Sequence, residues 1–447
     1  MKKIHFIAIG GSAMHNLAIS LHEKGYKITG SDDSLFEPSK SRLEQRNIAP
    51  KEIGWFEENI TPDLDAVILG MHAHADNPEL QRAKELNIPI YSYPEFLYEQ
   101  SKNQTRVVIG GSHGKTTITS MILHVLHYHE RKENYMVGAQ LEGFDVMVRL
   151  QDDADFMIME GDEYLSSTID RRPKFLLYQP NIALISGIAW DHINVFPTFE
   201  NYVQQFRDFV ASITNGGILI YNAEDFEVQK VINQSENPIR KIPYKTPKYA
   251  VKDGKTYLQT PFGEIPLKIF GQHNLSNLEG ARTLCNHLGI MDEDFYDAIQ
   301  SFGGAAKRLE KIKEENGKIV FKDYAHSPSK VKSTAKAVRE QFPDKKIIAC
   351  QELHTYSSLN RDFIDQYKNA LDPADEKIVY YSEDALRIKR REPIPPAEIK
   401  QAFGDESIQV FTNPEDLKEY LFQLNREDAV LLMMSSGNYG GLDLKSL

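Results

Sequence analysis

The sequence predicts an α/β protein with three domains, each built on a largely parallel sheet with flanking helices. The chain has 447 residues, and typical domains hold about 150 residues. Strand-like apolar runs alternate with helical patterns along the whole chain, and this alternation favours parallel sheets. We expect the domains to cover residues 1–103, 104–308 and 309–447.

The first hundred residues begin with a strand–helix–strand unit. Its elements are predicted at Ile4–Ile9, Ala13–Gly25 and Tyr26–Gly30. A dinucleotide fingerprint starting at residue 8 needs glycine at positions 8, 10 and 13, and only the second is present. A glycine turn ahead of a helix can still hold a diphosphate, and an acid after the second strand can bind a ribose hydroxyl. The candidate nucleotide-sugar residues are Gly10, Gly11, Ser12 and Asp32. A purely structural turn is the alternative.

A second unit opens with a strand, a glycine-rich loop and a helix, predicted at Arg106–Ile109 and Thr117–His129. Such a loop aims backbone N–H groups and a helix N-terminus at one point, which binds phosphate. Its lysine can reach the terminal phosphates of a nucleotide, and its first threonine can ligate Mg²⁺. The candidate ATP-binding residues of the loop are Gly111, Ser112, His113, Gly114, Lys115, Thr116 and Thr117.

Two further apolar strands end in side chains suited to a magnesium site. Phe156–Met159 leads to Glu160, and Ile182–Ile185 leads to Asp191-His192. Ligands of open parallel sheets sit at the carboxyl ends of the strands, where the phosphate loop also lies. We therefore expect Thr116, Glu160 and His192 to serve metal ions, and Lys115, Glu160 and His192 to act in catalysis.

Composition and charge exclude several classes of protein. The net charge is −12, whereas general nucleic-acid binding needs a basic face. Apolar runs such as Asp65–Gly70 fall far short of the roughly 20 residues of a membrane span, and the opening residues lack the pattern of a secretory signal. Only two cysteines occur, Cys285 and Cys350, so a disulfide framework is not expected. We expect a cytoplasmic protein with neither a nucleic-acid nor a membrane partner.

Taken in order, these motifs resemble those of the Mur ligases of peptidoglycan synthesis. The matching segments are Gly111–Thr117, Glu160, Asp191-His192, Gly271–Asn277, Arg308–Glu310 and Asp323–Pro328. The resemblance implies a Rossmann-like N-terminal domain for a UDP-sugar, a P-loop central ATPase and a Rossmann-like C-terminal domain that receives the amine. It also implies a reaction in which ATP phosphorylates a carboxylate and an amine displaces the phosphate. ATP and Mg²⁺ are the implied cofactors.

The resemblance also assigns residues outside the loop. His273, Asn274 and Asn277 match positions around the adenine, and Arg308, Asp323 and His326 fall in motifs that close the third domain onto the nucleotide. One departure concerns Gly187, which stands where many relatives have asparagine.

The opening strand and His113 resemble the branch of the family that acts on UDP-N-acetylmuramate itself. Asp170–Phe175 and Met434–Gly441 look like the recycling enzymes that add the tripeptide L-Ala-γ-D-Glu-meso-diaminopimelate, whereas Leu353–Ser357 is closer to the enzymes that add L-alanine. We expect the tripeptide as amine, with Arg171, Arg172 and Lys174 as candidate partners of its carboxylates, and L-alanine as the alternative. The enzyme is expected to be a monomer or a weak homodimer.

Overall fold

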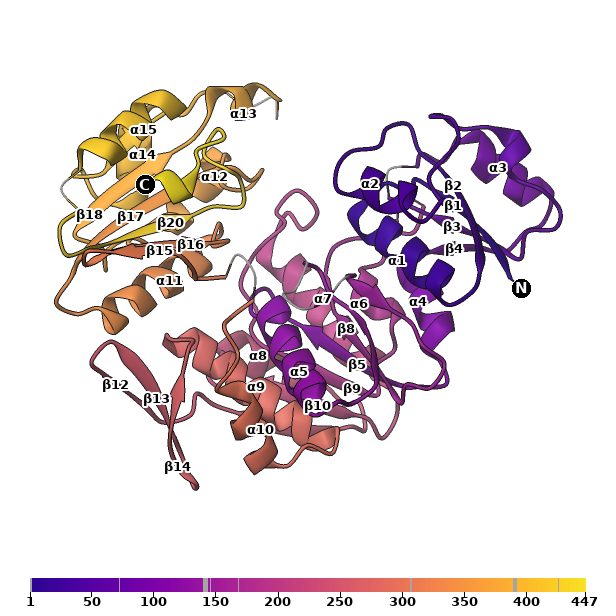
Figure 1. Cartoon of the computed structure of the whole chain (residues 1–447), viewed down its shortest axis with the longest axis horizontal. Coiled ribbons are helices and arrows are strands. Elements are labelled where there is room, and N and C mark those ends of the chain that lie inside the picture. Colours follow the sequence, from indigo (N-terminus) through magenta and orange to yellow (C-terminus); the bar gives the residue numbers. More distant parts are fainter. Residues whose placement is uncertain are drawn as a thin grey trace. The chain divides into compact units, whose positions relative to one another are not determined.

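The computed structural model describes residues 2–71, 73–139, 144, 146–167, 169–305, 308–388, 392–424 and 426–447. The described residues group into two compact units, whose helices and strands are labelled in Figure 1. The first unit holds Met1–Ile188 and Val203–Tyr244, and the second holds Ala189–Tyr202 and Lys245–Leu447.

The first unit begins with a parallel sheet of strand order β2-β1-β3-β4. Its strands are β1 (Lys3–Ile7), β2 (Lys27–Ser31), β3 (Ala66–Leu69) and β4 (Ile90–Ser92). Its helices are α1 (Ser12–Glu23), α2 (Ser39–Glu44), η1 (Glu57–Asn59), α3 (Pro78–Glu85) and α4 (Tyr93–Ser101). All of β3 and most of β1 are buried, as expected of parallel strands with both faces covered. The predicted strand–helix–strand opening is confirmed.

A second sheet of the same unit has the order β11-β10-β9-β5-β8-β6-β7, in which only the pairing of β7 with β6 is antiparallel. The strands are β5 (Thr105–Gly110), β6 (Glu133–Met136), β7 (Val148–Arg149), β8 (Phe156–Glu160), β9 (Ile182–Ile185), β10 (Ile218–Asn222) and β11 (Arg240–Tyr244). The helices are α5 (Lys115–Tyr128), α6 (Lys174–Leu177), α7 (Phe199–Ser212) and α8 (Phe226–Gln234). Because β5 lies between β8 and β9, the loops that follow these three strands meet at one edge of the sheet.

A buried arginine fixes the connection between these two sheets. The Arg106 guanidinium donates to the carbonyl oxygens of Lys102 at 3.1 Å and of Tyr178 at 2.9 Å, and it lies 5.1 Å from the centre of the Tyr98 ring. Arg106 therefore joins the residues that follow α4 to the segment that follows α6.

The second unit is organised around a sheet of order β15-β16-β20-β17-β18-β19, parallel except for β15. The strands are β15 (Glu310–Glu315), β16 (Lys318–Asp323), β17 (Lys346–Glu352), β18 (Glu376–Tyr380), β19 (Gln409–Phe411) and β20 (Ala429–Met434). The helices are α9 (Gln272–His287), α10 (Asp292–Ile299), α11 (Pro328–Gln341), α12 (Arg361–Ile364), η2 (Asp365–Tyr367), α13 (Glu383–Ile388), α14 (Pro396–Phe403), α15 (Pro414–Gln423) and η3 (Leu444–Ser446).

Side chains of this sheet alternate between two cores, as strand geometry requires. On β17, Ile347 and Ala349 join the core that contains α11 and α14, whereas Ile348 and Cys350 join the core that contains α15. Figure 1 shows these helices flanking the sheet.

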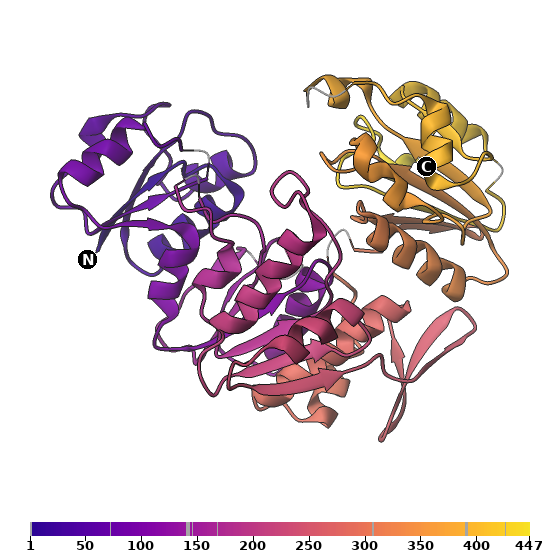
Figure 2. The same ribbon diagram turned by 180° about the vertical axis from the view of Figure 1, so that it is seen from behind.

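One sheet departs from the predicted parallel pattern. The strands β12 (Tyr249–Lys252), β13 (Lys255–Thr260) and β14 (Gly263–Leu267) form an antiparallel sheet, which both ribbon views show (Figure 1, Figure 2). Asp253 and Gly254 connect β12 to β13 with φ angles of 51° and 69°. Two positive φ angles in a two-residue loop are the mark of a tight hairpin turn, so the Asp-Gly pair was the local signal for this sheet.

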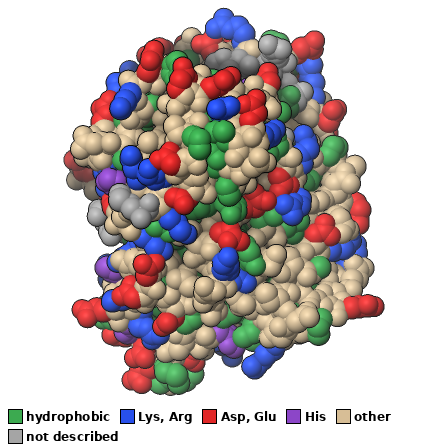
Figure 3. Space-filling model, turned by 90° about the vertical axis from the view of Figure 1, so that its right-hand side faces the viewer, with side chains coloured by type: hydrophobic (Ala, Val, Ile, Leu, Met, Phe, Trp, Pro, Cys, Tyr) green, Lys and Arg blue, Asp and Glu red, His purple; other side chains and the backbone are tan. Residues whose placement is uncertain are grey.

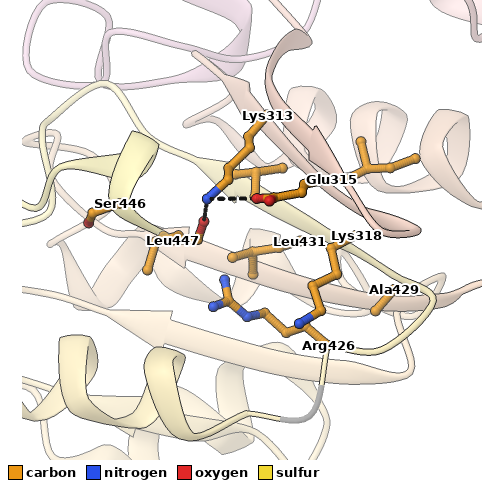
Figure 4. Close-up of a pocket in the computed structure, with 10 residues that line it drawn as sticks. Lys313, Glu315, Lys318, Arg426, Ala429, Leu431, Ser446 and Leu447 are labelled. Atoms are coloured by element: carbon orange, nitrogen blue, oxygen red, sulfur yellow. Dashed lines mark hydrogen bonds and ion pairs between the residues drawn. The ribbon is translucent and has the colours of Figure 1, made fainter.

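A small pocket lies at the amino ends of β16 and β20. Its volume is about 190 Å³, and its lining includes Lys313, Lys318 and Arg426. Lys313 donates to the Leu447 carbonyl oxygen at 3.0 Å and lies 3.6 Å from Glu315 (Figure 4). The motifs Asp323–Pro328 and Met434–Gly441 follow the opposite, carboxyl ends of these two strands, so this pocket is separate from them.

The distribution of charged side chains on the surface is consistent with the net charge of −12. On the face shown in Figure 3, acidic and basic side chains are intermixed and form no continuous basic area. None of the described helices combines the length and the apolar character needed to cross a membrane.

Glu133 at the start of β6 is expected to make stability depend on pH. Its side chain is buried at 2% exposure, and its Oε2 has no hydrogen-bond partner among the described residues. Burial raises the pKa of Glu133 from 4.5 to about 7, although Arg149 opposes the shift. The folded state therefore holds a proton that the unfolded state releases, and stability falls as the pH rises from about 4.5 to about 7.

We expect Glu133→Gln to be more stable than the wild type at pH 8 by on the order of 1–3 kcal/mol. The difference should shrink towards pH 4.5 in thermal unfolding measured across this range. Glu130→Gln, at an exposed position, controls for the loss of one negative charge. An equal difference at all pH values would contradict the assignment.

Candidate active site

The loop between β5 and α5 depends on glycine at two positions. Gly111 has a φ of 137° and Gly114, which caps α5, has a φ of 80°, a region that side chains with a Cβ avoid. A Cβ at position 111 would also overlap the Ser186 hydroxyl. The Ser112 N–H donates to the Gly187 carbonyl oxygen at 3.0 Å, so the loop lies tightly against the end of β9.

Lys115 at the first turn of α5 is held by an acid that the sequence analysis did not assign. Its Nζ donates to Glu163 Oε2 at 2.6 Å and to the Gly111 carbonyl oxygen at 2.6 Å. Burial by itself would lower the pKa of Lys115, but the nearby carboxylates of Glu163 and Asp162 outweigh it and leave the pKa raised. The ammonium therefore stays charged next to the loop. Glu163 follows β8 in the same polar segment as Glu160, which was the available signal.

Thr116 and Glu160 come together as the sequence predicted. The Thr116 hydroxyl donates to Glu160 Oε1 at 2.8 Å, and the Gly138 N–H donates to Glu160 Oε2 at 2.8 Å. Mg²⁺ is usually held by one or two protein oxygens, with water and substrate phosphates completing the shell. This hydroxyl and carboxylate fit that demand, although among the described residues no group of three His, Cys, Asp or Glu side chains could hold a metal by itself.

One cavity of about 410 Å³ joins the predicted phosphate and sugar-nucleotide residues. Gly11 and Ser12 at the start of α1 line it together with Lys115, Glu160 and Lys174. Residues about a hundred positions apart in the sequence therefore open onto one space in the first unit.

Asp32 holds the N-terminal glycine turn itself. The Gly10 N–H donates to Asp32 Oδ2 at 2.6 Å. Burial raises the pKa of Asp32 although the hydrogen bonds from Gly10 and Ser34 oppose the shift. A Cβ at position 10 would lie 2.9 Å from the same carboxylate oxygen. These contacts give Asp32 a structural role in the glycine turn, and its predicted ribose contact stays a prediction. Gly11 and Ser12 line the cavity.

Asp191 and His192 belong to the second unit, whereas Thr116 and Glu160 belong to the first. His192 adopts a φ of 53°, and its N–H donates to Asp191 Oδ1 at 2.8 Å. Asp191 Oδ2 also lies 3.4 Å from Lys330 Nζ on α11. These contacts fix the segment, and the predicted metal role of His192 stays a prediction.

Arg308, Asp323 and His326 lie together in the second unit. The Arg308 guanidinium lies 4.7 Å from the centre of the Tyr324 ring. Asp323 accepts hydrogen bonds from the N–H groups of Leu309 at 2.5 Å and Ala325 at 2.7 Å. Burial raises the pKa of Asp323, with Arg308 opposing, and burial lowers the pKa of His326 to about 4. His326 is therefore neutral at pH 7.

His273, Asn274 and Asn277 occupy the first turns of α9 (Gln272–His287). Asn274 is buried and donates from Nδ2 to the Phe270 carbonyl oxygen at 3.0 Å. Burial lowers the pKa of His273 to about 4, so this ring is also neutral at pH 7. A neutral imidazole and two carboxamides can pair with a base by hydrogen bonds.

Gly187 is explained by its contact with the phosphate loop. A Cβ at position 187 would approach His113 Nε2 to 2.5 Å, so the imidazole of His113 fills the space that a side chain would need. Only a residue without a side chain lets this ring lie against β9.

We expect Gly187→Asn to displace His113 and to destabilise the protein by about 1–3 kcal/mol, the usual cost of overpacking. Chemical unfolding measures this change, and the double variant His113→Gly/Gly187→Asn should recover most of the loss. Gly303→Asn is the control, because no described atom lies within 4 Å of its Cβ direction. A loss that persists in the double variant would refute the contact as its cause.

Comparison with known proteins identifies the family. Three models match successive segments: the Mur ligase family catalytic domain over residues 3–105, the Mur ligase middle domain over 109–285 and the Mur ligase glutamate ligase domain over 307–437. A UDP-N-acetylmuramate–L-alanine ligase from Sulfurihydrogenibium sp. is 32% identical over 449 residues, covering 98% of this chain and 95% of that protein. The enzyme of the same name from Aquifex aeolicus is 30% identical, covering 85% of this chain and 86% of the relative.

Solved structures share the fold. The UDP-N-acetylmuramate–alanine ligase of Thermotoga maritima superposes with a TM-score of 0.71 at 20% identity, covering 98% of this chain and 96% of that one. A murein peptide ligase from Psychrobacter arcticus superposes with a TM-score of 0.66 at 21% identity, covering 99% and 97%. The chain therefore belongs to the Mur ligase family, whose members are ATP-dependent, ADP-forming amide ligases of peptidoglycan synthesis.

Proposed function

We propose that this enzyme joins the carboxylate of UDP-N-acetylmuramate to L-alanine, with ATP converted to ADP and phosphate. The proposal that UDP-N-acetylmuramate supplies the carboxylate rests on the cavity that Gly11 and Ser12 share with Lys115 and Glu160. It allows a sugar nucleotide and the terminal phosphate of ATP to meet in one space. The proposal that L-alanine is the amine is supported by relatives that match this chain over most of their length and are named L-alanine ligases.

In the proposed reaction, a carboxylate oxygen of the substrate attacks the γ-phosphorus of ATP, and the bond to the β-phosphate oxygen breaks. The amine then attacks the resulting acyl phosphate, phosphate leaves, and the amine nitrogen loses its proton. Both steps build negative charge on phosphoryl oxygens, and fixed positive groups stabilise such charge. Mg²⁺, which Thr116 and Glu160 would hold, would supply further positive charge beside the phosphates.

The roles of individual residues follow from this chemistry. Lys115 stabilises the transferring phosphoryl group and exchanges its contact with Glu163 for one with phosphate. Thr116 and Glu160 hold Mg²⁺, and His192 serves a second ion. The remaining proposed ATP contacts are Gly111, Ser112, His113, Gly114, Thr117, His273, Asn274, Asn277, Arg308, Asp323 and His326. We also propose the domain ranges 1–103, 104–308 and 309–447 as functional divisions of the chain.

The tripeptide of the recycling enzymes is the second candidate amine, favoured by the sequences at 170–175 and 434–441. One of its supports is weakened, because Arg172 is bound by Asp170 at 2.6 Å and approached by Glu95 at 3.5 Å. The two C-terminal segments that point to different amines lie together. A Cβ at Gly437 would lie 2.9 Å from His354 Nδ1, and the Tyr439 N–H donates to Glu352 Oε2 at 3.0 Å.

A phosphate-release assay decides between the two amines. With UDP-N-acetylmuramate, ATP and Mg²⁺ present, we expect turnover with L-alanine at least about tenfold faster in kcat/KM than with L-Ala-γ-D-Glu-meso-diaminopimelate, since a pocket built for one amine leaves polar groups of the other unpaired. Faster turnover with the tripeptide would assign the enzyme to recycling. Turnover with neither would refute the proposed function.

Lys115→Met is expected to lower kcat/KM at least about a hundredfold, because the charge facing the transferring phosphoryl group is lost. The substitution also leaves Glu163 buried without its partner, so Lys115→Met/Glu163→Gln is needed to restore the thermal midpoint without restoring turnover. Lys132→Met, a lysine with a 67% exposed side chain, should keep wild-type rates. Full activity of a folded Lys115→Met enzyme would refute the phosphate role.

A further inference from the structure

A buried hydroxyl of the cavity lacks a partner. Tyr178 is fully buried, and its hydroxyl has no hydrogen-bond partner among the described residues. The same residue lines the cavity that holds Lys115, Gly11 and Ser12. Burying a hydroxyl without a partner is unfavourable, so this group is suited to an acceptor that enters the cavity from outside the protein.

Lys174 supplies a positive charge to the same space. It begins α6 and lines the cavity, and its Nζ lies 2.7 Å from Asp162 Oδ2. A lysine ammonium has three N–H donors, and among the described residues Asp162 is its one ion-pair partner. Donors therefore remain for a ligand, while Asp162 keeps the ammonium in position.

Local backbone geometry turns the two groups in the same direction. Tyr178 follows α6 directly and continues its helical turn with φ −79° and ψ −19°. Residues four positions apart on a helix share a face, and both side chains line one cavity. An ammonium and a hydroxyl in this arrangement can bind the same anionic group. Lys174 provides the positive charge, and Tyr178 provides an additional hydrogen-bond donor.

The remaining groups of the cavity indicate which anion this is. Gly11 and Ser12 at the start of α1 suit the diphosphate, and Lys115 suits the terminal phosphate of ATP. A substrate carboxylate must approach that phosphate against electrostatic repulsion, and a cation near both lowers this repulsion. Lys174 is the other lysine on the cavity wall.

Resting on the proposed function, we infer that Lys174 and Tyr178 bind the carboxylate of the sugar-nucleotide substrate and present it to the terminal phosphate of ATP. This assignment differs from the sequence-based expectation, in which Lys174 was a candidate partner for carboxylates of the amine substrate. Lys174 acts by charge and Tyr178 by a single hydrogen bond, so their substitution should have different consequences.

The test compares two sugar nucleotides that differ by this carboxylate. UDP-N-acetylmuramate carries it on a lactyl ether, and UDP-N-acetylglucosamine lacks it. Binding is measured by calorimetry with Mg²⁺ and a non-hydrolysable ATP analogue present. Wild-type protein should prefer UDP-N-acetylmuramate. Lys174→Met should raise the Kd for UDP-N-acetylmuramate about ten- to a hundredfold, the range of a charge-assisted hydrogen bond. The Kd for UDP-N-acetylglucosamine should stay within about twofold of the wild-type value. Lys174→Arg should keep part of the preference.

Tyr178→Phe tests the hydrogen bond from the hydroxyl without disturbing an ion pair. It should weaken UDP-N-acetylmuramate about three- to tenfold and leave the ligand-free thermal midpoint unchanged or higher, since the hydroxyl has no partner to lose. Lys132→Met controls for the loss of one surface charge.

If Lys174→Met and Tyr178→Phe both keep the wild-type preference, or weaken both nucleotides equally, the inference is wrong while the proposed function stands. If wild-type protein shows no preference and no turnover, the proposed function itself fails.

Discussion

The site is organised around a buried positive charge. The Lys115 side chain is only 14% exposed, and an ammonium taken out of water is costly unless an anion and good hydrogen bonds accompany it. Glu163 and the Gly111 carbonyl oxygen provide both, each at 2.6 Å. This requirement ties the end of β8 to the start of α5.

The same region depends on how closely backbones can approach. Gly111 lies where any Cβ would overlap the Ser186 hydroxyl, and Gly187 leaves room for the His113 imidazole. These two glycines let the phosphate loop rest on the end of β9, where the Ser112 N–H donates to the Gly187 carbonyl oxygen. In this chain, the space that a side chain at position 187 would need is filled by the His113 imidazole.

Much of the architecture was predictable from local patterns. Apolar runs between polar turns marked β1, β5, β8 and β9, because strands covered on both faces are apolar along most of their length. The glycine-rich loop was also predictable, because its glycine, lysine and threonine residues at this spacing are typical of a phosphate-binding loop. The antiparallel sheet β12-β13-β14 was missed, because its strands are half exposed and contain no continuous apolar run. Its Asp253-Gly254 turn was the readable sign.

The sequence by itself determined the order of the motifs, the chemistry of the phosphate loop and the membership in the family. Each of these depends on residues that lie close together in the chain. The tertiary structure alone decided that Glu163 holds Lys115, that Asp32 closes its own glycine turn, and that Lys174 and Tyr178 share a cavity with Gly11 and Ser12. The physical reason is that ion pairing and cavity lining depend on distances between segments far apart in sequence. Local residue patterns do not contain those distances.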